Sequence, residues 1–72
     1  MTTKIINGET YTANYNADLN GFDCLYNGYD YDFISGRLAA NEDAAIIVYK
    51  IRLNESQEAF RQFEKSHPEL NP

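Results

Sequence analysis

The sequence predicts an α+β fold, a small antiparallel β-meander of four or five strands with one C-terminal α-helix packed on a face. Three observations predict it. Short runs of β-branched and aromatic residues fill the first half of the chain. Three of the four glycines follow an asparagine, a pair typical of tight hairpin turns because both residues tolerate positive φ. Near the end of the chain, apolar residues recur at the three- and four-residue spacing of a helix.

The Asn-Gly pairs divide the first half of the chain into strands. Asn7-Gly8 joins the first two strands, and Asn27-Gly28 centres a hairpin between the third and the fourth. Residues 14–20 are rich in Asn and Asp, which is typical of a loop. The first four strands are predicted at about residues 3–6, 9–15, 22–26 and 29–35.

Residues 44–53 are predicted to form a fifth, central strand. Ile47 and Tyr49 alternate with Ile46, so apolar side chains lie on both faces of an extended chain. Such a strand is covered on both sides, as in the middle of a sheet. For residues 37–43 the sequence leaves two possibilities open: the fourth strand continues into a turn, or the segment forms a helical turn.

The helix is predicted at about residues 55–66. Asn54 is a suitable N-cap, and Gln57 stands at the capping-box position three residues later. Phe60 and Phe63 belong to an apolar stripe that we expect to pack on the aromatic face of the sheet.

The hairpin around Asn27-Gly28 is predicted to place two aspartates opposite each other. Its two-residue loop fixes a register in which six apolar or aromatic side chains share one side, as the facing pairs Tyr26 and Tyr29, Cys24 and Tyr31, and Phe22 and Phe33. On the other side, Leu25 faces Asp30 and Asp23 faces Asp32. Facing like charges destabilise a strand pair, so this arrangement calls for a reason.

The net charge of −5 lies in the N-terminal half of the chain. Residues 5–36 contain five acidic side chains and no basic one. This half also contains five of the six tyrosines, and tyrosine is common at interface hot spots. Direct nucleic-acid binding is disfavoured because phosphates require a cationic face. A basic protein partner is favoured, and the candidate partner-binding residues are Asp23, Asp30, Asp32, Asp18, Glu9, Leu25, Tyr15 and Tyr29.

The acidic hairpin has other interpretations. Its aspartates form a solvated surface, a surface for a cationic partner, or a metal site. Residues 16–21 follow the order of an EF-hand loop, but Asn27 stands where the loop requires a glutamate, which disfavours calcium. The tyrosines belong to the core or to an interface. Lys50 and Arg52 either neutralise the hairpin or leave the molecule with one strongly negative end.

Composition argues against several other classes of protein. Seventy-two residues suffice for a single domain. The single cysteine, Cys24, excludes an internal disulfide and a thiolate zinc site. A catalytic pair of Cys24 and His67 is also disfavoured, because no third group is present to orient the histidine as a base. We therefore expect neither an enzyme nor a cofactor. No apolar run reaches the ~20 residues that span a bilayer, and no signal peptide opens the chain, so a soluble cytoplasmic protein that binds no membrane is expected.

In its small size, acidic half and single domain, the chain is similar to the acidic inhibitors that phages make against bacterial defence systems, such as anti-restriction and anti-CRISPR proteins. The resemblance implies a non-enzymatic inhibitor, monomeric or homodimeric, of a nucleic-acid-binding enzyme or complex in the host cytoplasm. Nucleic-acid mimicry is one form of it, because Asp30 and Asp32 on one strand are about 6.8 Å apart, close to two base steps. The alternative is a structural subunit or a homodimerising accessory protein.

Overall fold

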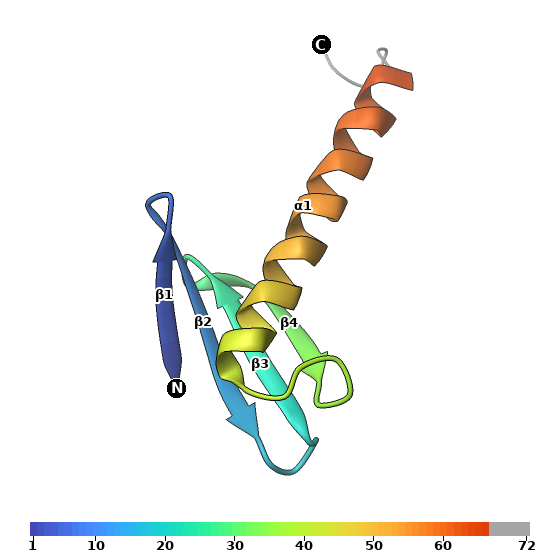
Figure 1. Cartoon of the computed structure of the whole chain (residues 1–72). Helices are drawn as coiled ribbons and strands as arrows, with labels where there is room; N and C mark the ends of the chain where they lie inside the picture. Colours follow the sequence, from blue (N-terminus) through green and yellow to red (C-terminus); the bar gives the residue numbers. More distant parts are fainter. Residues whose placement is uncertain (67–72) are drawn as a thin grey trace.

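The computed structural model describes residues 1–66, with side chains to residue 56, and contains a four-stranded antiparallel sheet and one long helix (Figure 1). The sheet order is β1-β2-β3-β4, and the helix α1 packs on one face. The elements are β1 (Thr2–Ile6), β2 (Glu9–Asn16), β3 (Gly21–Tyr26), β4 (Tyr29–Ser35) and α1 (Glu42–Ser66). The predicted α+β class, with four strands and one C-terminal helix, is confirmed.

The Asn-Gly turns connect the strands as predicted. At Asn7-Gly8 both residues have positive φ, 53° and 79°, and Ile6 pairs with Glu9 across a two-residue loop. Asn27-Gly28 has the same conformation, with φ of 49° and 81°. The four strands begin and end within one residue of the predicted bounds because this turn chemistry sets where each strand stops.

The predicted strand at residues 44–53 is wrong, because this segment forms the first half of α1. Its apolar residues also fit the helical period, since Ala45, Ile46 and Tyr49 lie on one side of the helix and are buried. The four strands form a sheet with one strongly apolar face, and a helix covers that face where a fifth strand would leave it exposed. No helix within residues 1–66 is long and apolar enough to cross a membrane.

The N-cap of α1 is Asn41, thirteen residues before Asn54, the N-cap predicted from the sequence. The Asn41 side-chain oxygen accepts a hydrogen bond from the Ala44 N–H at 2.8 Å, and its backbone oxygen accepts one from the Ala45 N–H at 3.0 Å. These are the bonds of an N-cap residue. Of the two possibilities for residues 37–43, the turn is present, because the Leu38 N–H donates to the Ser35 carbonyl at 2.9 Å directly after β4. The last two residues of this segment, Glu42 and Asp43, already belong to α1.

The predicted helix at residues 55–66 is the second half of α1, and its end at Ser66 is confirmed. Asn54 is an interior helix residue, so the prediction of an N-cap there was wrong. The expected packing of Phe60 and Phe63 on the sheet lies outside the described side chains. In Figure 1 the helix backbone runs well past the end of the sheet.

The register of the β3–β4 hairpin differs from the prediction after the first pair. Tyr26 faces Tyr29 as expected, but Cys24 then pairs with Asp32, so Leu25 lies opposite two residues. This is a β-bulge, and Asp30 occupies it with a positive φ of 52°. The one-residue shift moves every later side chain of β4 to the other face of the sheet. Asp23 and Asp32 therefore lie on opposite faces of the sheet, and the prediction that these two carboxylates face each other is wrong.

The core lies between α1 and one face of the sheet. Because of the bulge, Ile34 turns toward α1 in place of Phe33 and becomes fully buried. The aromatic rings of Tyr11 and Tyr49 meet edge to face, with centroids 6.4 Å apart. The buried residues are Tyr11, Ala13, Phe22, Cys24, Ile34, Ala39, Ala45, Ile46 and Tyr49. Cys24 points into this core, as predicted.

The position of the N-cap is tested by a pair of matched substitutions. Asn41→Ala removes the side-chain acceptor of the Ala44 N–H and should lower the free energy of unfolding by about 1 kcal/mol. Asn54→Ala is the control, because in an exposed helix interior alanine is the better helix former and the free energy should stay equal or rise. Urea denaturation followed by circular dichroism measures both. A larger loss for Asn54→Ala would mean that the helix begins at Glu55.

Candidate functional site

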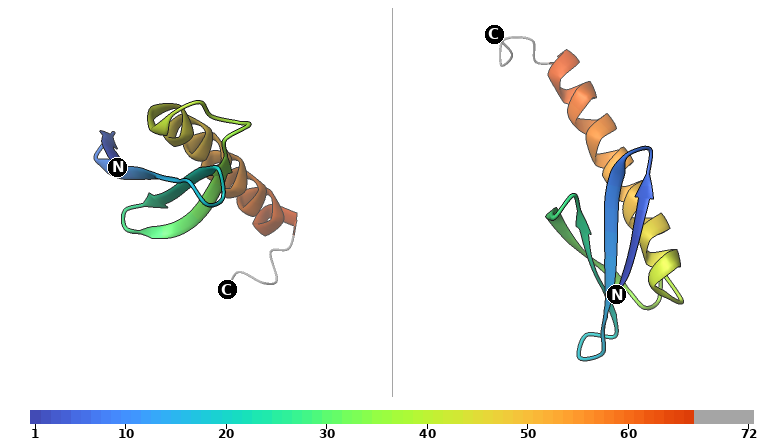
Figure 2. Two further views of the ribbon diagram at one scale, coloured as in Figure 1. Left: turned by 90° about the horizontal axis from the view of Figure 1, so that it is seen from below. Right: turned by 90° about the vertical axis from the view of Figure 1, so that its left-hand side faces the viewer.

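One face of the sheet carries no covering element within the described residues. Figure 2 shows α1 on a single side of the sheet, so the opposite side, here called the open face, is exposed. Strand alternation and register assign eleven strand side chains to the open face, namely Thr3, Ile5, Thr10, Thr12, Asn14, Asn16, Asp23, Leu25, Tyr31, Phe33 and Ser35. Asp23 is the charged member of this set, and the others are apolar, aromatic or neutral polar.

Asp23 lies near the middle of the open face and accepts two hydrogen bonds. The Tyr31 hydroxyl donates to its Oδ1 at 2.5 Å, and the Asn16 side-chain amide donates to its Oδ2 at 3.1 Å. The hydrogen bond to Asp23 raises the pKa of Tyr31, so this hydroxyl stays protonated and keeps donating. None of the three ion pairs of the described side chains includes Asp23.

Apolar and aromatic side chains surround this carboxylate. Leu25 is 36% exposed and Tyr31 is 60% exposed. The ring of Phe33 lies over Gly21, where a Cβ would collide with it, so glycine at this position lets the ring rest on the backbone. Sequence reasoning missed Tyr31 and Phe33 because it assigned them to the core side of the hairpin. The available signal was Ile34, the apolar residue that breaks the alternation of β4.

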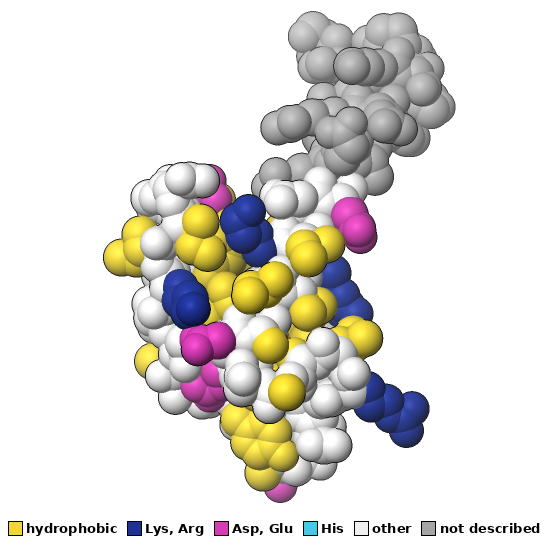
Figure 3. Space-filling model, in the orientation of Figure 1, with side chains coloured by type: hydrophobic (Ala, Val, Ile, Leu, Met, Phe, Trp, Pro, Cys, Tyr) yellow, Lys and Arg dark blue, Asp and Glu magenta, His cyan; other side chains and the backbone are white. Residues whose placement is uncertain are grey.

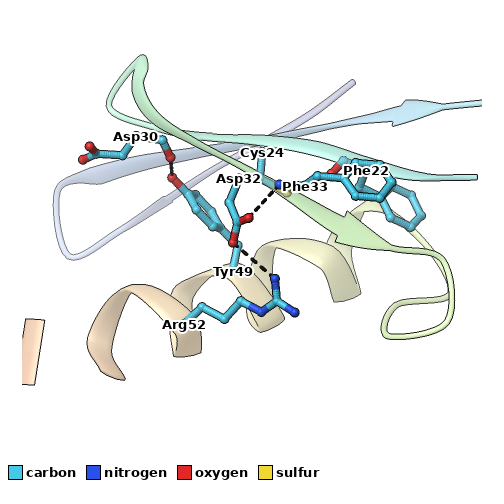
Figure 4. A network of polar contacts seen from close by, with 7 residues as sticks. All are labelled: Phe22, Cys24, Asp30, Asp32, Phe33, Tyr49 and Arg52. Atoms are coloured by element: carbon cyan, nitrogen blue, oxygen red, sulfur yellow. Dashed lines mark hydrogen bonds and ion pairs between the residues drawn. The ribbon is translucent and has the colours of Figure 1, made fainter. Parts of the chain in front are cut away.

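Asp32 and Asp30, both predicted to bind a partner, contact α1, Asp32 through its carboxylate and Asp30 through its backbone carbonyl, while the Asp30 side chain is exposed. In Figure 4 the Asp32 carboxylate points toward α1 and lies between strand and helix. Its Oδ2 contacts Arg52 Nη1 at 3.3 Å, and its Oδ1 accepts a hydrogen bond from the Phe33 N–H at 2.8 Å. The backbone carbonyl of Asp30 accepts a hydrogen bond from the Tyr49 hydroxyl. The bulge also breaks the regular spacing of the two aspartates on which the predicted mimicry of base steps depended.

These contacts satisfy backbone groups at the outer edge of β4. An edge strand exposes unpaired N–H and C=O groups that invite other strands. On β4 the Phe33 N–H is bonded to the Asp32 carboxylate and the Asp30 carbonyl to the Tyr49 hydroxyl, so this edge is partly closed. Arg52 lies on α1 and pairs with Asp32 across the interface of helix and sheet, so its charge neutralises one acidic side chain of the hairpin.

The other predicted site residues are scattered. Asp18 is exposed in the turn between β2 and β3, and Glu9 lies at the start of β2, where it accepts a hydrogen bond from the Tyr11 hydroxyl at 3.1 Å. Tyr15 packs on Phe22 beside a hollow of about 560 Å³ at the start of α1. Tyr29 is 76% exposed next to the Asn-Gly turn. Of the eight predicted residues, the structure brings Asp23 and Leu25 together on the open face.

Cys24 has the environment of a structural thiol. It is fully buried, and burial, followed by the charges of Asp32 and Asp23, raises its pKa to about 11. Since the thiolate is the nucleophile, the thiol is inert at neutral pH. Within the part of the chain that the structure describes, no three His, Cys, Asp or Glu side chains gather in a way that could hold a metal ion.

Glu42 ties the start of α1 to the ends of two strands. Its Oε1 accepts a hydrogen bond from the Thr2 hydroxyl at 2.7 Å and lies 3.5 Å from the N-terminal amine, while its Oε2 accepts one from the Tyr15 N–H at 2.9 Å. The bond from Thr2, then the bond from Tyr15, lower the pKa of Glu42. The helix dipole favours a carboxylate at this position as well.

No protein-family model, no curated protein and no solved structure matches this chain.

The hydrogen bond from Tyr49 to β4 is tested by removing one hydroxyl. Tyr49→Phe keeps the buried ring and leaves the Asp30 carbonyl without its donor, so the free energy of unfolding should fall by about 1 kcal/mol. Tyr29→Phe is the matched control, because that exposed tyrosine should contribute nothing measurable. Urea denaturation compares the two variants with the wild type. Equal stability of all three proteins would contradict the assigned role of Tyr49.

The contacts of Glu42 predict a loss of stability in acid. Because its pKa is lower in the folded than in the unfolded protein, the folded state binds fewer protons as the pH falls below the ordinary value of 4.5. The stabilisation is complete above that pH and disappears as the pH falls through the folded pKa. Glu42→Gln should therefore be less stable than the wild type at neutral pH, and the difference should shrink in acid. Denaturation at a series of pH values measures it, with Glu55→Gln, an exposed position, as the control. An unchanging difference would refute the prediction.

Proposed function

We propose that this protein is a small non-enzymatic binding protein whose open face docks on a basic partner protein. The observation that carries the proposal is the combination, on one uncovered sheet face, of the Asp23 carboxylate with the exposed Leu25 and Tyr31. A face of this kind offers tyrosine, apolar contact area and one negative charge, the composition that is common at interface hot spots.

The geometry of the face favours an arginine of the partner. Asp23 already accepts bonds from Tyr31 and Asn16, which hold the carboxylate in place, and a carboxylate has further lone pairs to accept a guanidinium. The rings of Tyr31 and Phe33 flank the same region, and aromatic rings attract the guanidinium plane. A lysine would gain less, because its ammonium cannot form the paired hydrogen bonds.

The most specific form of the proposal is an inhibitor of a nucleic-acid-binding defence enzyme, of the anti-CRISPR or anti-restriction kind. It rests on the small size and acidic N-terminal half of the chain, together with the basic surfaces that such enzymes use to hold phosphates. The spacing of aspartates along β4 is not part of the proposal, because Asp32 is paired with Arg52. Occlusion of a basic groove by the open face is the expected mode of inhibition.

The proposal is tested by affinity capture from a lysate of the native host, at low and then at high salt, followed by titration of the purified partner. Asp23→Asn and Tyr31→Ala should each weaken the affinity about 10-fold or more, because each removes a central group of the open face. The salt dependence should decrease for Asp23→Asn, because a charge pair with the partner is lost.

Matched controls separate the open face from general charge and aromatic content. Asp18→Asn removes an exposed acid from the turn, and Tyr29→Ala removes an exposed tyrosine next to the Asn-Gly loop, so both should bind as the wild type does. Circular dichroism and urea denaturation verify that all four variants are folded. Equal affinity for the open-face variants and the controls would refute the proposed binding surface.

A further inference from the structure

The outer side of α1, turned away from the sheet, carries an apolar stripe in its first half. Ile47 and Ile51 lie one turn apart on this side, and Ala44 and Val48 border them, half-buried against the core. Ile47 is 57% exposed and Ile51 is 52% exposed. Figure 3 views the molecule from the side of α1, and hydrophobic side chains gather over the first half of this helix.

The opposite side of the same turns already packs on the sheet. Ala45, Ile46 and Tyr49 are buried there, with exposed fractions of 0%, 0% and 1%. The first half of α1 is therefore apolar around most of its circumference, which is the pattern of a helix buried on two sides. The sheet provides one cover, and within the described residues nothing covers the other. Beyond Ile51 the outer side turns polar at Asn54 and Glu55, so the outer stripe has a defined end.

The charges beside the outer stripe are complementary to those of a second copy in antiparallel orientation. Asp43 precedes Ile47 by four residues and Lys50 follows it by three, so both charges lie on the same flank of the stripe. When two such helices pack antiparallel about a two-fold axis at Ile47, like flanks meet. Asp43 of each copy then approaches Lys50 of the other, and the two isoleucines at the centre contact each other.

We propose that the outer stripe is the site at which a second copy of this chain docks, helix against helix, in an antiparallel pair. Asp43 contacts Lys4 at 3.4 Å, and its side chain is 61% exposed, so the carboxylate remains accessible to a second cation. Lys50 belongs to none of the three ion pairs of the described side chains. The open face lies on the other side of the sheet, so dimerisation leaves the proposed binding surface accessible.

Sedimentation of the full chain over concentrations from about 10 μM to about 1 mM tests the proposal. The wild type should show a monomer–dimer equilibrium, because a helix pair two turns long makes a small interface and associates weakly. The double substitution Ile47→Glu with Ile51→Glu should keep the chain monomeric over the whole range. Ile5→Glu replaces a similarly exposed isoleucine of the open face and should leave the equilibrium unchanged. A wild type that is monomeric at the highest concentration, or a dimer that survives the double substitution, would overturn the proposal.

A charge exchange tests the antiparallel geometry separately from apolar association. Asp43→Lys places two lysines against each other at each end of the pair, and Lys50→Glu places two acids there, so each should weaken dimerisation about 5-fold or more. The chain with both substitutions restores opposite charges and should recover most of the wild-type dimerisation constant. Failure of the combined variant to recover would refute the antiparallel pair. Each variant should retain its helix, because Asp43 is exposed and Lys50 is half-buried, and circular dichroism checks this.

Discussion

The left-handed conformation of Asp30 decides which side chains of β4 face the helix. With φ at 52°, this residue adds a position to β4 opposite Leu25 and reverses the two faces for every later residue of the strand. Ile34 thereby enters the core, Phe33 rests on Gly21, and the two aspartates that a regular hairpin would oppose lie on different faces. An aspartate suits this position because its short polar side chain tolerates positive φ better than other non-glycine residues.

The bulge also aligns β4 with α1. It presents the Asp30 carbonyl to the Tyr49 hydroxyl and the Asp32 carboxylate to Arg52, so two residues one helical turn apart hold the edge strand (Figure 4). At the other end of the helix contact, Glu42 binds groups of β1 and β2. Polar contacts thus join the helix to β1 and β2 near one edge of the sheet and to β4 at the other edge. Ile46 and Tyr49 are buried between these contacts. These polar contacts give the packing one orientation, which apolar burial alone does not specify.

Two layers cannot bury all the apolar surface of this chain. The helix covers one face of the sheet, which leaves Leu25 and Tyr31 exposed on the open face and Ile47 and Ile51 exposed on the outer side of α1. A small domain has a high ratio of surface to volume, so some apolar exposure is normal. Leu25 with Tyr31 and Ile47 with Ile51 form two separate groups on opposite sides of the molecule, and the charged residues beside each group differ. That segregation is why the two surfaces are assigned different partners.

The sequence by itself determined the turns, the four strands, the buried position of Cys24 and the end of the helix. These depend on local chemistry, chiefly the positive φ that Asn-Gly pairs accept. Tertiary structure decided the conformation of residues 44–53 and the register after Leu25. In the first case the apolar pattern fits both a central strand and a helix with two apolar sides, and the choice depends on the sheet face that needs a cover. In the second, a single left-handed residue outweighs the alternation because Ile34 then gains a buried site and Asp32 a cationic partner. The candidate site changed accordingly: the sequence placed Asp23 and Leu25 on one surface, and the packing of β4 added Tyr31 and Phe33 and removed Asp32.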